Sequence, residues 1–392
     1  MTDKSPVPTS LESIQPVSSD APEPSGAPKA GIALCLSGGG YRAMIFHLGA
    51  LWRLNQIGFL KKLARVSSVS GGSITAGVLA LAWKDLKFDE NGVAGNLDEL
   101  VIKPIRRLAN NTIDQGSILK GMLLPRRSIS DEVTAAYRDH LFGKATLQNL
   151  PADNEGPRFV INATNVQTKV LWRFSRPYMG DYRVGLIKNP TTELAVAVAA
   201  SSAFPPFLSP AQLELQTSDF DPNTPAALAD EAYRSKVVLT DGGVYDNLGL
   251  ETAWKSYDTI LVSDGGGAAG DESDPERDWA RHSYRILNLL DNQVRSLRKR
   301  QVIDSYKHSV RKGTYWGIRT NILDYGLPNA MNCPFSQTME LANVATRLKA
   351  LDSTLQERII NWGYAVCDAA MRTHVDGTLP EATVFPYAAA GV

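Results

Sequence analysis

The chain has 392 residues, of which 43% are hydrophobic and 21% are charged, so it can bury a sizeable core. Lysine plus arginine and aspartate plus glutamate both number 41, which removes any overall basic signal for nucleic-acid binding. Three scattered cysteines are too few for a disulfide framework or a zinc site and indicate a reducing compartment. We therefore expect a globular, cytoplasmic protein with no nucleic-acid partner.

Residues 1–29 differ in composition from the rest of the chain. They are rich in proline and serine, contain no aromatic residue and lack the continuous apolar core of a signal peptide, so we expect a disordered tail. A secretion or docking signal is the alternative interpretation. No apolar run reaches the roughly 20 residues that a membrane-spanning helix needs. The nearest, at 74–83, is too short, and we expect no transmembrane segment.

The first predicted element is the apolar run 32–36, which ends in glycines as a strand buried on both faces does. A helical pattern follows over 41–56, then a strand at 66–69 and a helix over about 73–83. Strands and helices alternating in this order favour a parallel sheet covered by helices. Further along, the patterns predict strands at 159–164 and 170–175, a helix over 193–204, and strands at 236–243 and 258–267 that end in Asp-Gly turns.

Beyond about residue 276 the chain becomes helical and charged, and its longest predicted helix covers 285–306. We expect one α/β domain over 30–270 and a helical C-terminal extension over 271–392 that packs on it. The long helix combines basic residues with an apolar stripe, namely Arg295, Arg298, Lys299 and Arg300 with Ile286, Leu289, Leu290, Val294 and Leu297. Such a helix either lies in a membrane interface or, more commonly, docks its apolar face on the parent domain.

Ser70 lies at the junction between the second predicted strand and the helix that follows it. A serine on a sharp strand-to-helix turn has its hydroxyl lifted clear of the sheet, and the helix points its positive N-terminus at it. Such a turn is crowded, so its neighbours must be small, as Ser68, Gly71 and Gly72 are. The stretch matches the pattern G-x-S-x-G except that Ser68 replaces the first glycine. Ser70 is therefore a candidate nucleophile; a small-residue turn with no catalytic role is the alternative.

Three consecutive glycines, Gly38, Gly39 and Gly40, separate the first predicted strand from the first helix. Their backbone N–H groups can face outward together and hold an anion, either a phosphate or the oxyanion of an acyl-transfer intermediate. Arg42 would hold this loop in shape or add positive potential. A glycine-rich turn that allows close helix–strand packing is the alternative interpretation.

The same loop fits a loose dinucleotide-binding pattern. That pattern needs an acidic residue for the ribose about 20 residues further on, and residues 57–66 contain none. The chain also lacks the G-K-[ST] sequence of a phosphate-binding P-loop at this position. We therefore expect no nucleotide cofactor.

Asp241 ends a predicted apolar strand and is followed by Gly242 and Gly243. A serine nucleophile needs a general base, and the edge of a sheet is where α/β proteins build such sites. The chain has only five histidines, of which His47 alone lies beside these motifs, so Asp241 is the better candidate base. A plain Asp-Gly turn is the alternative.

The strand–GGGYR–helix stretch, the SxSGGS turn and the DGG turn, in this order, resemble the patatin-like phospholipase family. The resemblance covers about residues 30–270 and implies a three-layer α/β fold with a mainly parallel central sheet covered by helices. It implies that Ser70 is the nucleophile and Asp241 the base of a Ser-Asp dyad that operates without histidine.

The resemblance extends to further positions. It assigns an oxyanion-hole role to Gly38, Gly39, Gly40 and Arg42, and a DGG turn to Gly242 and Gly243. Residues 199–210 are similar to a small-residue segment before a proline turn that lies near the site in relatives. Ser68 and Ala43 stand where the family usually or frequently has glycine, and neither departure removes a chemical group.

The implied activity is that of a lipid acyl hydrolase of phospholipase A or lysophospholipase type, which forms an acyl-Ser70 intermediate. Its substrate would be membrane or micellar lipid, contacted peripherally, with no metal and no cofactor; the sequence identifies no protein activator. One alternative is a Ser-His-Asp esterase using a later histidine, His282, His308 or His374. Another is a catalytically silent lipid-binding or regulatory protein of the same fold.

Overall fold

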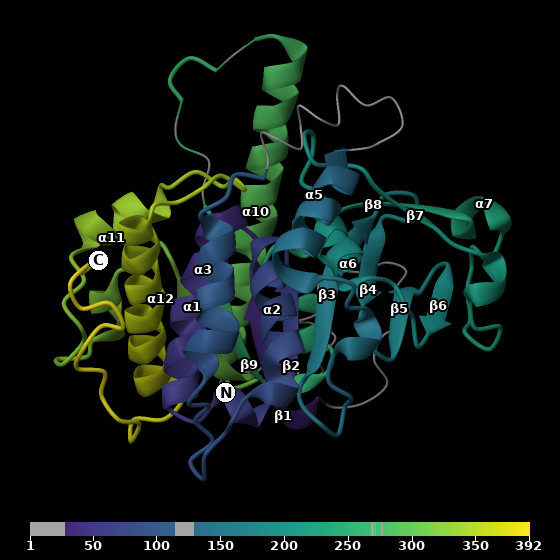
Figure 1. Ribbon diagram of the computed structural model, residues 1–392. Coiled ribbons are helices and arrows are strands. Elements are labelled where there is room, and N and C mark those ends of the chain that lie inside the picture. Colours follow the sequence, from purple (N-terminus) through teal and green to yellow (C-terminus); the bar gives the residue numbers. More distant parts are fainter. Residues whose placement is uncertain (1–27, 114–128, 268–269, 271, 276) are drawn as a thin grey trace, which may run out of the picture.

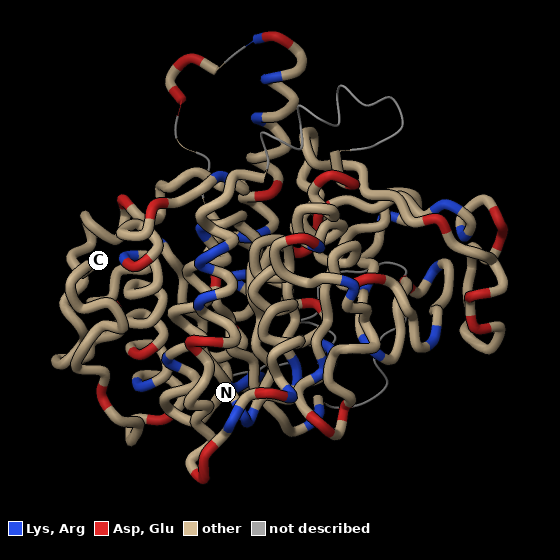
Figure 2. The backbone as a smooth tube through the Cα atoms, viewed as in Figure 1, with Lys and Arg blue, Asp and Glu red and all other residues tan. Residues whose placement is uncertain are grey.

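The computed structural model of the chain describes residues 28–113, 129–267, 270, 272–275 and 277–392. The predicted tail therefore lies outside the described residues, apart from its last two positions. Strand β1 already begins at Lys29 within that range. Figure 2 shows acidic and basic segments interspersed along the chain, as the equal numbers of the two charge types lead one to expect.

A mixed sheet of ten strands forms the centre of the molecule (Figure 1). Five of its strands run parallel in the order β10-β9-β1-β2-β3, and the others continue the sheet in antiparallel pairs. The parallel strands are β1 (Lys29–Leu36), β2 (Leu63–Val69), β3 (Arg158–Asn165), β9 (Tyr257–Asp264) and β10 (Lys312–Gly317). The antiparallel strands are β4 (Val170–Phe174), β5 (Tyr178–Asp181), β6 (Gly185–Lys188), β7 (Ala211–Glu214) and β8 (Lys236–Asp241).

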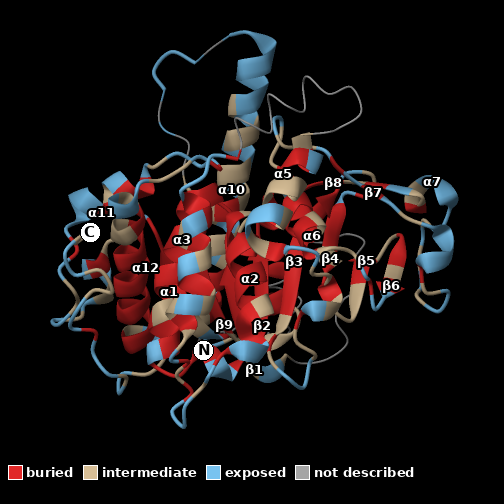
Figure 3. Cartoon of the chain, in the orientation of Figure 1, coloured by how far each residue is buried: buried red, intermediate tan, exposed pale blue. Residues whose placement is uncertain are grey.

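Helices cover both faces of this sheet (Figures 1 and 3). They are α1 (Gly40–Gln56), α2 (Gly71–Ala82), α3 (Lys103–Ala109), α5 (Ile129–Tyr137), α6 (Leu194–Ser201), α7 (Glu231–Arg234), α8 (Gly243–Asp246), α9 (Glu251–Trp254), α10 (Trp279–Lys307), α11 (Phe335–Ala342) and α12 (Ser353–His374). Alternate residues of β1 belong to two separate apolar clusters. Leu34 and Leu36 pack in the cluster that includes α1, α2 and α12, whereas Ala33 and Cys35 pack with α9 and α10. The result is three layers, with the parallel strands buried on both faces.

The sequence patterns located these elements well. Every strand and helix predicted above is present, and the three-layer α/β fold with parallel central strands is confirmed. The C-terminal part is not purely helical, because it also supplies β10 at the edge of the sheet. The long helix α10 also differs from the more common expectation for such helices. Four apolar residues of its predicted stripe, Ile286, Leu289, Leu290 and Leu297, are exposed instead of docked on the domain.

Two strands meet end to end along one edge of β3, and this meeting places the site. β2 runs parallel to β3 as far as the pair Val69–Asn162. β8 approaches from the opposite direction and ends at the pair Asp241–Ala163, while β4 occupies the other edge of Ala163. The residue after Val69 and the last residue of β8 therefore lie at neighbouring positions along β3, although they are far apart in the sequence.

Candidate active site

Ser70 forms the turn between β2 and α2. Its backbone angles are φ 51° and ψ −121°, a conformation that residues with a side chain rarely adopt. Its N–H donates to Ser201 Oγ at 3.0 Å, which fixes the turn from the side of α6. The strained strand-to-helix turn at the start of a helix is the local geometry that exposes a nucleophilic hydroxyl.

The residues around Ser70 are small because three backbone segments cross there. A Cβ added to Gly71 would lie 2.2 Å from the carbonyl oxygen of Gly40, and one added to Gly72 would lie 2.5 Å from that of Leu36. Both distances are shorter than any ordinary contact, so neither position accepts a side chain. The turn after β2 thus packs directly against the turn after β1.

Ser68 stands where the pattern has glycine, and the structure accommodates it. Its side chain is fully buried, and its hydroxyl donates to the carbonyl of Val160 at 3.4 Å and accepts from Ser73 Oγ at 3.0 Å. A buried hydroxyl with two partners costs little free energy. The departure from glycine is therefore compatible with the turn.

Asp241 ends β8 with its side chain buried beside Ser70. Oδ1 accepts a 2.7 Å hydrogen bond from the Gly243 N–H, whereas Oδ2 is buried without a full hydrogen bond among the described residues. Burial raises the pKa of Asp241 to about 7, and the Gly243 amide and the Ser70 hydroxyl each lower this pKa in part. The carboxylate thus faces the serine, and its remaining lone pairs are under-used.

Gly242 and Gly243 have distinct roles in holding this carboxylate. A Cβ on Gly242 would lie 2.3 Å from the carbonyl oxygen of Asn162, so the turn leaves β8 in close contact with β3. Gly243 begins α8 and supplies the amide that binds Oδ1. The turn therefore fixes Oδ1 and leaves Oδ2 without a hydrogen bond among the described residues.

The three glycines of the loop after β1 are not equivalent. The Gly38 N–H donates to the Asn247 backbone carbonyl at 3.0 Å and to its side-chain oxygen at 3.1 Å. Gly38 is thus already occupied, in contrast to the role expected for it from the sequence. The N–H groups of Gly39 and Gly40 make no hydrogen bond within the described part of the chain, and both residues line the cavity described below.

Both free amides depend on a glycine backbone. Gly39 has φ 140° and Gly40 has φ 61°, conformations that a side chain would strain. These two residues offer paired donors at the start of α1, where the helix dipole is positive.

The guanidinium of Arg42 points away from the cavity. It donates to the carbonyls of Gly265, Ala342 and Val344 and to Thr346 Oγ1. Burial lowers its pKa to about 10, which leaves it charged at neutral pH. Arg42 therefore ties the glycine loop to the segment that follows α11 and donates no hydrogen bond toward Ser70.

The segment 199–210, singled out in the sequence for its small residues, holds both candidate catalytic residues in place. Ser201 Oγ donates to the Asn162 carbonyl at 2.6 Å and accepts from the Ser70 N–H. The Asp241 N–H donates to the carbonyl of Ala203 at 2.9 Å. One short stretch of chain thus fixes the backbones of the serine and the aspartate relative to each other.

Ser70, Asp241, Gly39 and Gly40 open together into a cavity of about 530 Å³. Its wall contains two groups that sequence patterns did not reveal. One is the inner face of α10, and the other is the segment 345–348 before α12. Both come from the C-terminal part of the chain, and neither carries a recognisable motif. Only the predicted long helix gave a signal that this region mattered.

The histidines lie elsewhere. His282, His308 and His374 are absent from the described lining of the cavity. His47 is buried between Ser263 Oγ at 2.8 Å and the Ser37 carbonyl at 3.0 Å, and burial lowers its pKa to about 4. Within the described residues, no group of three or more His, Cys, Asp or Glu side chains is arranged to hold a metal ion.

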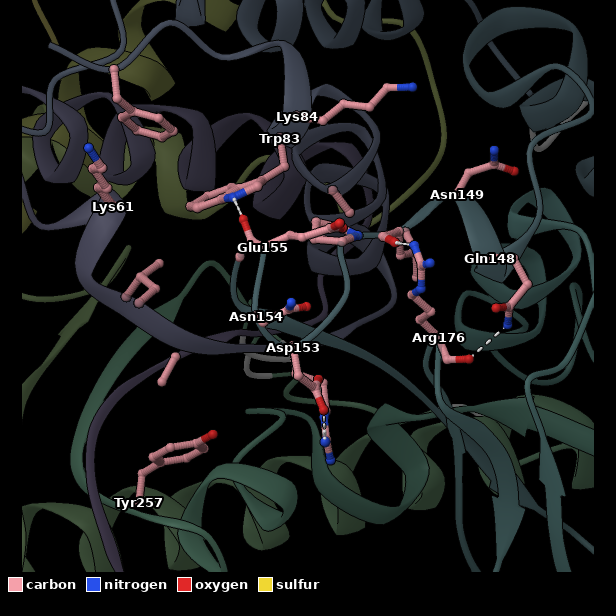
Figure 4. A pocket seen from close by; sticks show the side chains of 18 residues that line it. Lys61, Trp83, Lys84, Gln148, Asn149, Asp153, Asn154, Glu155, Arg176 and Tyr257 are labelled. Atoms are coloured by element: carbon pink, nitrogen blue, oxygen red, sulfur yellow. Dashed lines mark hydrogen bonds and ion pairs between the residues drawn. The ribbon is translucent and has the colours of Figure 1, made fainter.

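A larger and more open cavity of about 930 Å³ lies at the amino ends of β2, β3 and β9 (Figure 4). Two of its arginines are engaged with the protein itself. Arg158 pairs with Asp153, and Arg176 donates to the Leu150 carbonyl at 2.6 Å. This cavity contains neither Ser70 nor Asp241, so its size does not make it the candidate active site.

The layered α/β fold, with a serine turn and a buried carboxylate at one edge of β3, is typical of serine hydrolases. Comparison with known proteins identifies the family. The model of the patatin-like phospholipase family matches residues 34–254, which is more than half of the chain. The chain belongs to this family. No curated protein shows significant sequence similarity to it.

Solved structures resemble this chain at low sequence identity. Human GIVD cytosolic phospholipase A2 in complex with methyl γ-linolenyl fluorophosphonate is 11% identical, with a TM-score of 0.50 over 87% of this chain and 57% of that chain. VipD from Legionella pneumophila is 15% identical, with a TM-score of 0.30 over 80% of this chain and 66% of that chain. The chain thus spans little more than half the length of the human enzyme.

Proposed function

We propose that the protein is a lipid acyl hydrolase that cleaves carboxylic esters through an acyl-Ser70 intermediate, with Asp241 as general base. The observation that carries the proposal is a buried carboxylate facing a strained serine beside two free amides. Family membership supports the lipid ester as substrate. The apolar side of the cavity, formed by Phe204, Phe207, Leu208 and Leu348, fits an acyl chain.

In the acylation step, Ser70 Oγ attacks the ester carbonyl carbon while Asp241 Oδ2 accepts the hydroxyl proton. The carbonyl oxygen becomes an oxyanion, which the N–H groups of Gly39 and Gly40 stabilise. Collapse of this intermediate breaks the ester C–O bond, and the proton on Asp241 passes to the leaving alcohol. A pKa of about 7 suits this exchange because the same group must accept and return a proton near neutral pH.

Deacylation repeats the sequence with water as nucleophile. Asp241 accepts a proton from the water, the hydroxide oxygen bonds to the acyl carbon, and the same two amides bind the second oxyanion. The bond to Ser70 Oγ then breaks and the serine recovers its proton from Asp241. The products are a fatty acid and the free enzyme.

Two alternatives make different predictions for the same residues. A Ser-His-Asp esterase would need a histidine at the cavity, and the three candidate histidines do not line it. A silent lipid-binding protein would bind lipid without reacting at Ser70. Neither alternative gives Asp241 the role of accepting the serine proton directly.

The direct test measures release of fatty acid from mixed lipids by mass spectrometry, together with labelling by a fluorophosphonate probe. We expect wild-type protein to release fatty acid and to be labelled at Ser70. Ser70→Ala and Asp241→Asn should each abolish release while circular dichroism stays unchanged. Full activity in either variant would exclude the dyad, and binding without labelling would favour the silent protein. Substituting His282, His308 and His374 together should leave activity intact.

We further propose that the outer face of α10 contacts the lipid surface that supplies the substrate. Trp279, Ile286, Leu290 and Leu297 repeat at intervals of seven, four and seven residues, which places them on one face of the helix, and each is at least 42% exposed. The end of α10 that carries Trp279 stands clear of the domain in Figure 3. No described helix is long and apolar enough to cross a bilayer, so this contact would be peripheral.

The position of α10 at the cavity supports a lipid surface as its partner. Tyr284 lines the cavity and contacts the exposed ring of Phe207 at a centroid distance of 6.1 Å, so apolar surface continues from the outer helix to the opening. The basic residues favoured earlier are less suitable, because Arg298 pairs with Glu251 at 3.1 Å and Lys299 lies over the Tyr315 ring.

Flotation with liposomes tests this surface. Ile286→Glu with Leu290→Glu should reduce the floated fraction severalfold while hydrolysis of a short, monomeric ester stays unchanged. Leu323→Glu is the matched control, since Leu323 is 75% exposed and belongs to the turn after β10 instead of to α10. Unchanged flotation of the double variant would exclude this surface. Dimers of wild type that the double variant lacks, seen by analytical ultracentrifugation, would identify the face as an interface between copies.

A further inference from the structure

The inner face of α10 presents a polar set of side chains to the cavity, opposite in character to its apolar outer face. Asn288, Asn292 and Arg295 follow each other at intervals of four and three residues, and all three line the cavity. Asp291 lies between them along the same wall. None of these residues belongs to the part of the chain that matches the family.

Arg295 is buried yet has few partners. The residue is 8% exposed, and its one hydrogen bond to the described residues is a weak 3.4 Å contact from Nη2 to Asn292 Oδ1. No carboxylate of the described residues forms an ion pair with it, although Asp264 and Asp291 lie near enough to act on it electrostatically. A buried guanidinium has five N–H donors to satisfy, so most of its capacity remains available at the cavity.

Two neighbouring arginines show what a satisfied guanidinium looks like in this protein. Arg42 donates to four acceptors of the protein, and Arg298, one turn further along α10, pairs with Glu251 at 3.1 Å. Neither lines the cavity. Arg295 differs from both because it lines the cavity and has no acceptor closer than 3.4 Å among the described residues.

The nearest carboxylates do not use up Arg295. Asp264 accepts a 2.7 Å hydrogen bond from Tyr315 Oη and a 2.9 Å hydrogen bond from the Gly266 N–H, so it is held by other groups. Among the described residues, Asp291 accepts only a 3.5 Å contact from Asn247 Nδ2; burial raises the pKa of its carboxyl, and Arg295 lowers it in part. An incoming anion would therefore meet a guanidinium that donates a single weak hydrogen bond to the described residues.

We propose that Arg295, with the side-chain amides of Asn288 and Asn292, forms an anion subsite that binds a phosphate group at the polar end of the substrate. A guanidinium binds phosphate through two parallel hydrogen bonds, and the amides add further donors. The apolar wall of Phe204, Phe207 and Leu348 takes the acyl chain at the same time. The preferred substrates are then acyl esters that carry a phosphate, in preference to neutral glycerides; this inference rests on the proposed hydrolase function.

A matched pair of substrates isolates the phosphate. A lysophosphatidylcholine and a monoacylglycerol with the same acyl chain are presented in the same neutral-detergent micelles, and kcat/KM is measured for each. Arg295→Met should lower kcat/KM for the lysophospholipid by about 10- to 100-fold, the usual effect of removing a charged hydrogen bond. Its kcat/KM for the monoacylglycerol should stay within about threefold of wild type, because the reacting groups are untouched.

Two further variants control this measurement. Arg300 lies on the same helix, is exposed and does not line the cavity. Arg300→Met should therefore leave kcat/KM for both substrates unchanged. Arg295→Lys keeps the positive charge and should recover part of the lysophospholipid activity. If Arg295→Met lowers both activities equally, or lowers neither, the subsite is excluded. If Arg295→Met does not fold, Arg295→Lys must still show the selective loss for the subsite to stand.

Inorganic phosphate, added as an inhibitor, shows whether the subsite binds free phosphate or only a phosphate that is part of a lipid. Competitive inhibition of monoacylglycerol hydrolysis in wild type, absent in Arg295→Met, would show that the subsite also takes free phosphate. No inhibition, together with the selective loss above, would mean that it requires the attached lipid. Binding of the lysophospholipid to Ser70→Ala, weakened by adding Arg295→Met, reports on the subsite without catalysis. If wild type hydrolyses neither ester yet this binding difference persists, the proposed hydrolase fails and the subsite does not.

Discussion

The two cavities of this protein, at opposite ends of the parallel strands, differ in how their polar groups are satisfied. In the larger cavity (Figure 4), Arg176 is held by a backbone carbonyl, and Arg158 and Asp153 neutralise each other. In the smaller cavity, considering the described residues alone, Asp241 Oδ2 lacks a full hydrogen bond and Arg295 has a single weak one. Burying polar groups without full hydrogen bonding costs free energy, which a ligand bound in the smaller cavity would recover.

The difference also explains why volume is a poor guide to chemistry here. The larger cavity lies between the amino ends of β2, β3 and β9 and the loop that precedes β3, and the Arg158–Asp153 pair joins that loop to β3. The smaller one lies where β2 and β8 meet end to end, which forces a serine and an aspartate together. The proposed reactivity depends on that meeting and on the burial of the aspartate, and not on the size of the opening.

The strongest test of the comparison substitutes one aspartate in each cavity. Asp241→Asn removes the general base and should lower kcat/KM for ester hydrolysis by about 10²–10⁴-fold. Asp153→Asn makes the same carboxylate-to-amide change in the larger cavity and should leave kcat/KM unchanged. Steady-state kinetics on a short-chain ester measures both. Comparable losses in the two variants would contradict the distinction drawn between the cavities.

Replacing a glycine of the loop after β1 is expected to have the next largest effect. In Gly39→Ala the added Cβ would lie 2.9 Å from both Ala43 Cβ and the Gly265 carbonyl oxygen, and φ 140° is strained for alanine. The loop must shift and misdirect the oxyanion donors, so kcat should fall by about 10²-fold. Gly95→Ala is the control, because a Cβ there meets nothing within 4 Å. Normal kcat in Gly39→Ala would remove this loop from the mechanism.

The pH dependence of catalysis follows from the raised pKa of Asp241. The carboxyl must be ionised to accept the serine proton, so kcat/KM should fall about tenfold per pH unit below a pH of about 7. A pH–rate profile from 5 to 9, taken where the protein stays folded, checks this. A profile that stays flat down to pH 5 would mean that Asp241 is an ordinary carboxylate and not the base.

The two aspartates should also affect stability in opposite directions. Because the folded pKa of Asp241 is raised, its contribution to the free energy of unfolding is full in acid and is lost as pH rises through about 7. Arg158 lowers the pKa of Asp153, so its contribution is present at neutral pH and is lost on acidification. Asp241→Asn should therefore gain stability relative to wild type between pH 5 and pH 8, as measured by urea unfolding. Asp153→Asn should gain none over this range.

Sequence patterns located the parts of the site that depend on local backbone geometry. The serine turn, the glycines at 39 and 40 and the Asp-Gly turn are each required by a positive φ or by a contact too close for a side chain. Such requirements appear in the sequence as small residues at fixed spacing. The strands that carry these turns were equally visible, because strands buried on both faces are continuous apolar runs.

The remaining parts depend on contacts between distant segments, and local patterns carry no signal for them. The occupation of the Gly38 amide by Asn247 joins residues 209 positions apart. The antiparallel approach of β8 to β3 decides where Asp241 lies, and it cannot be read from the strand itself. The faces of α10 could not be assigned for the same reason: its apolar stripe left docking, the more common outcome, and a membrane interface open, whereas the domain buries Arg295 and leaves Leu290 exposed.

Replacing Ser68 should have the smallest effect on activity. The substitution tests whether a side chain near Ser70 whose hydrogen bonds are all made within the protein contributes to stability alone. The Ser68 hydroxyl accepts a hydrogen bond from Ser73 Oγ and donates one to the Val160 carbonyl. Ser68 is two residues from Ser70 in the sequence but does not line the cavity. Ser68→Ala should lower the free energy of unfolding by about 1 kcal/mol, through the lost hydrogen bonds, and leave kcat/KM within about twofold of wild type. Urea unfolding and ester kinetics measure the two quantities. A large loss of activity at unchanged stability would contradict this expectation. It would mean that a polar group near Ser70 can matter for catalysis even when the protein already satisfies its hydrogen bonds.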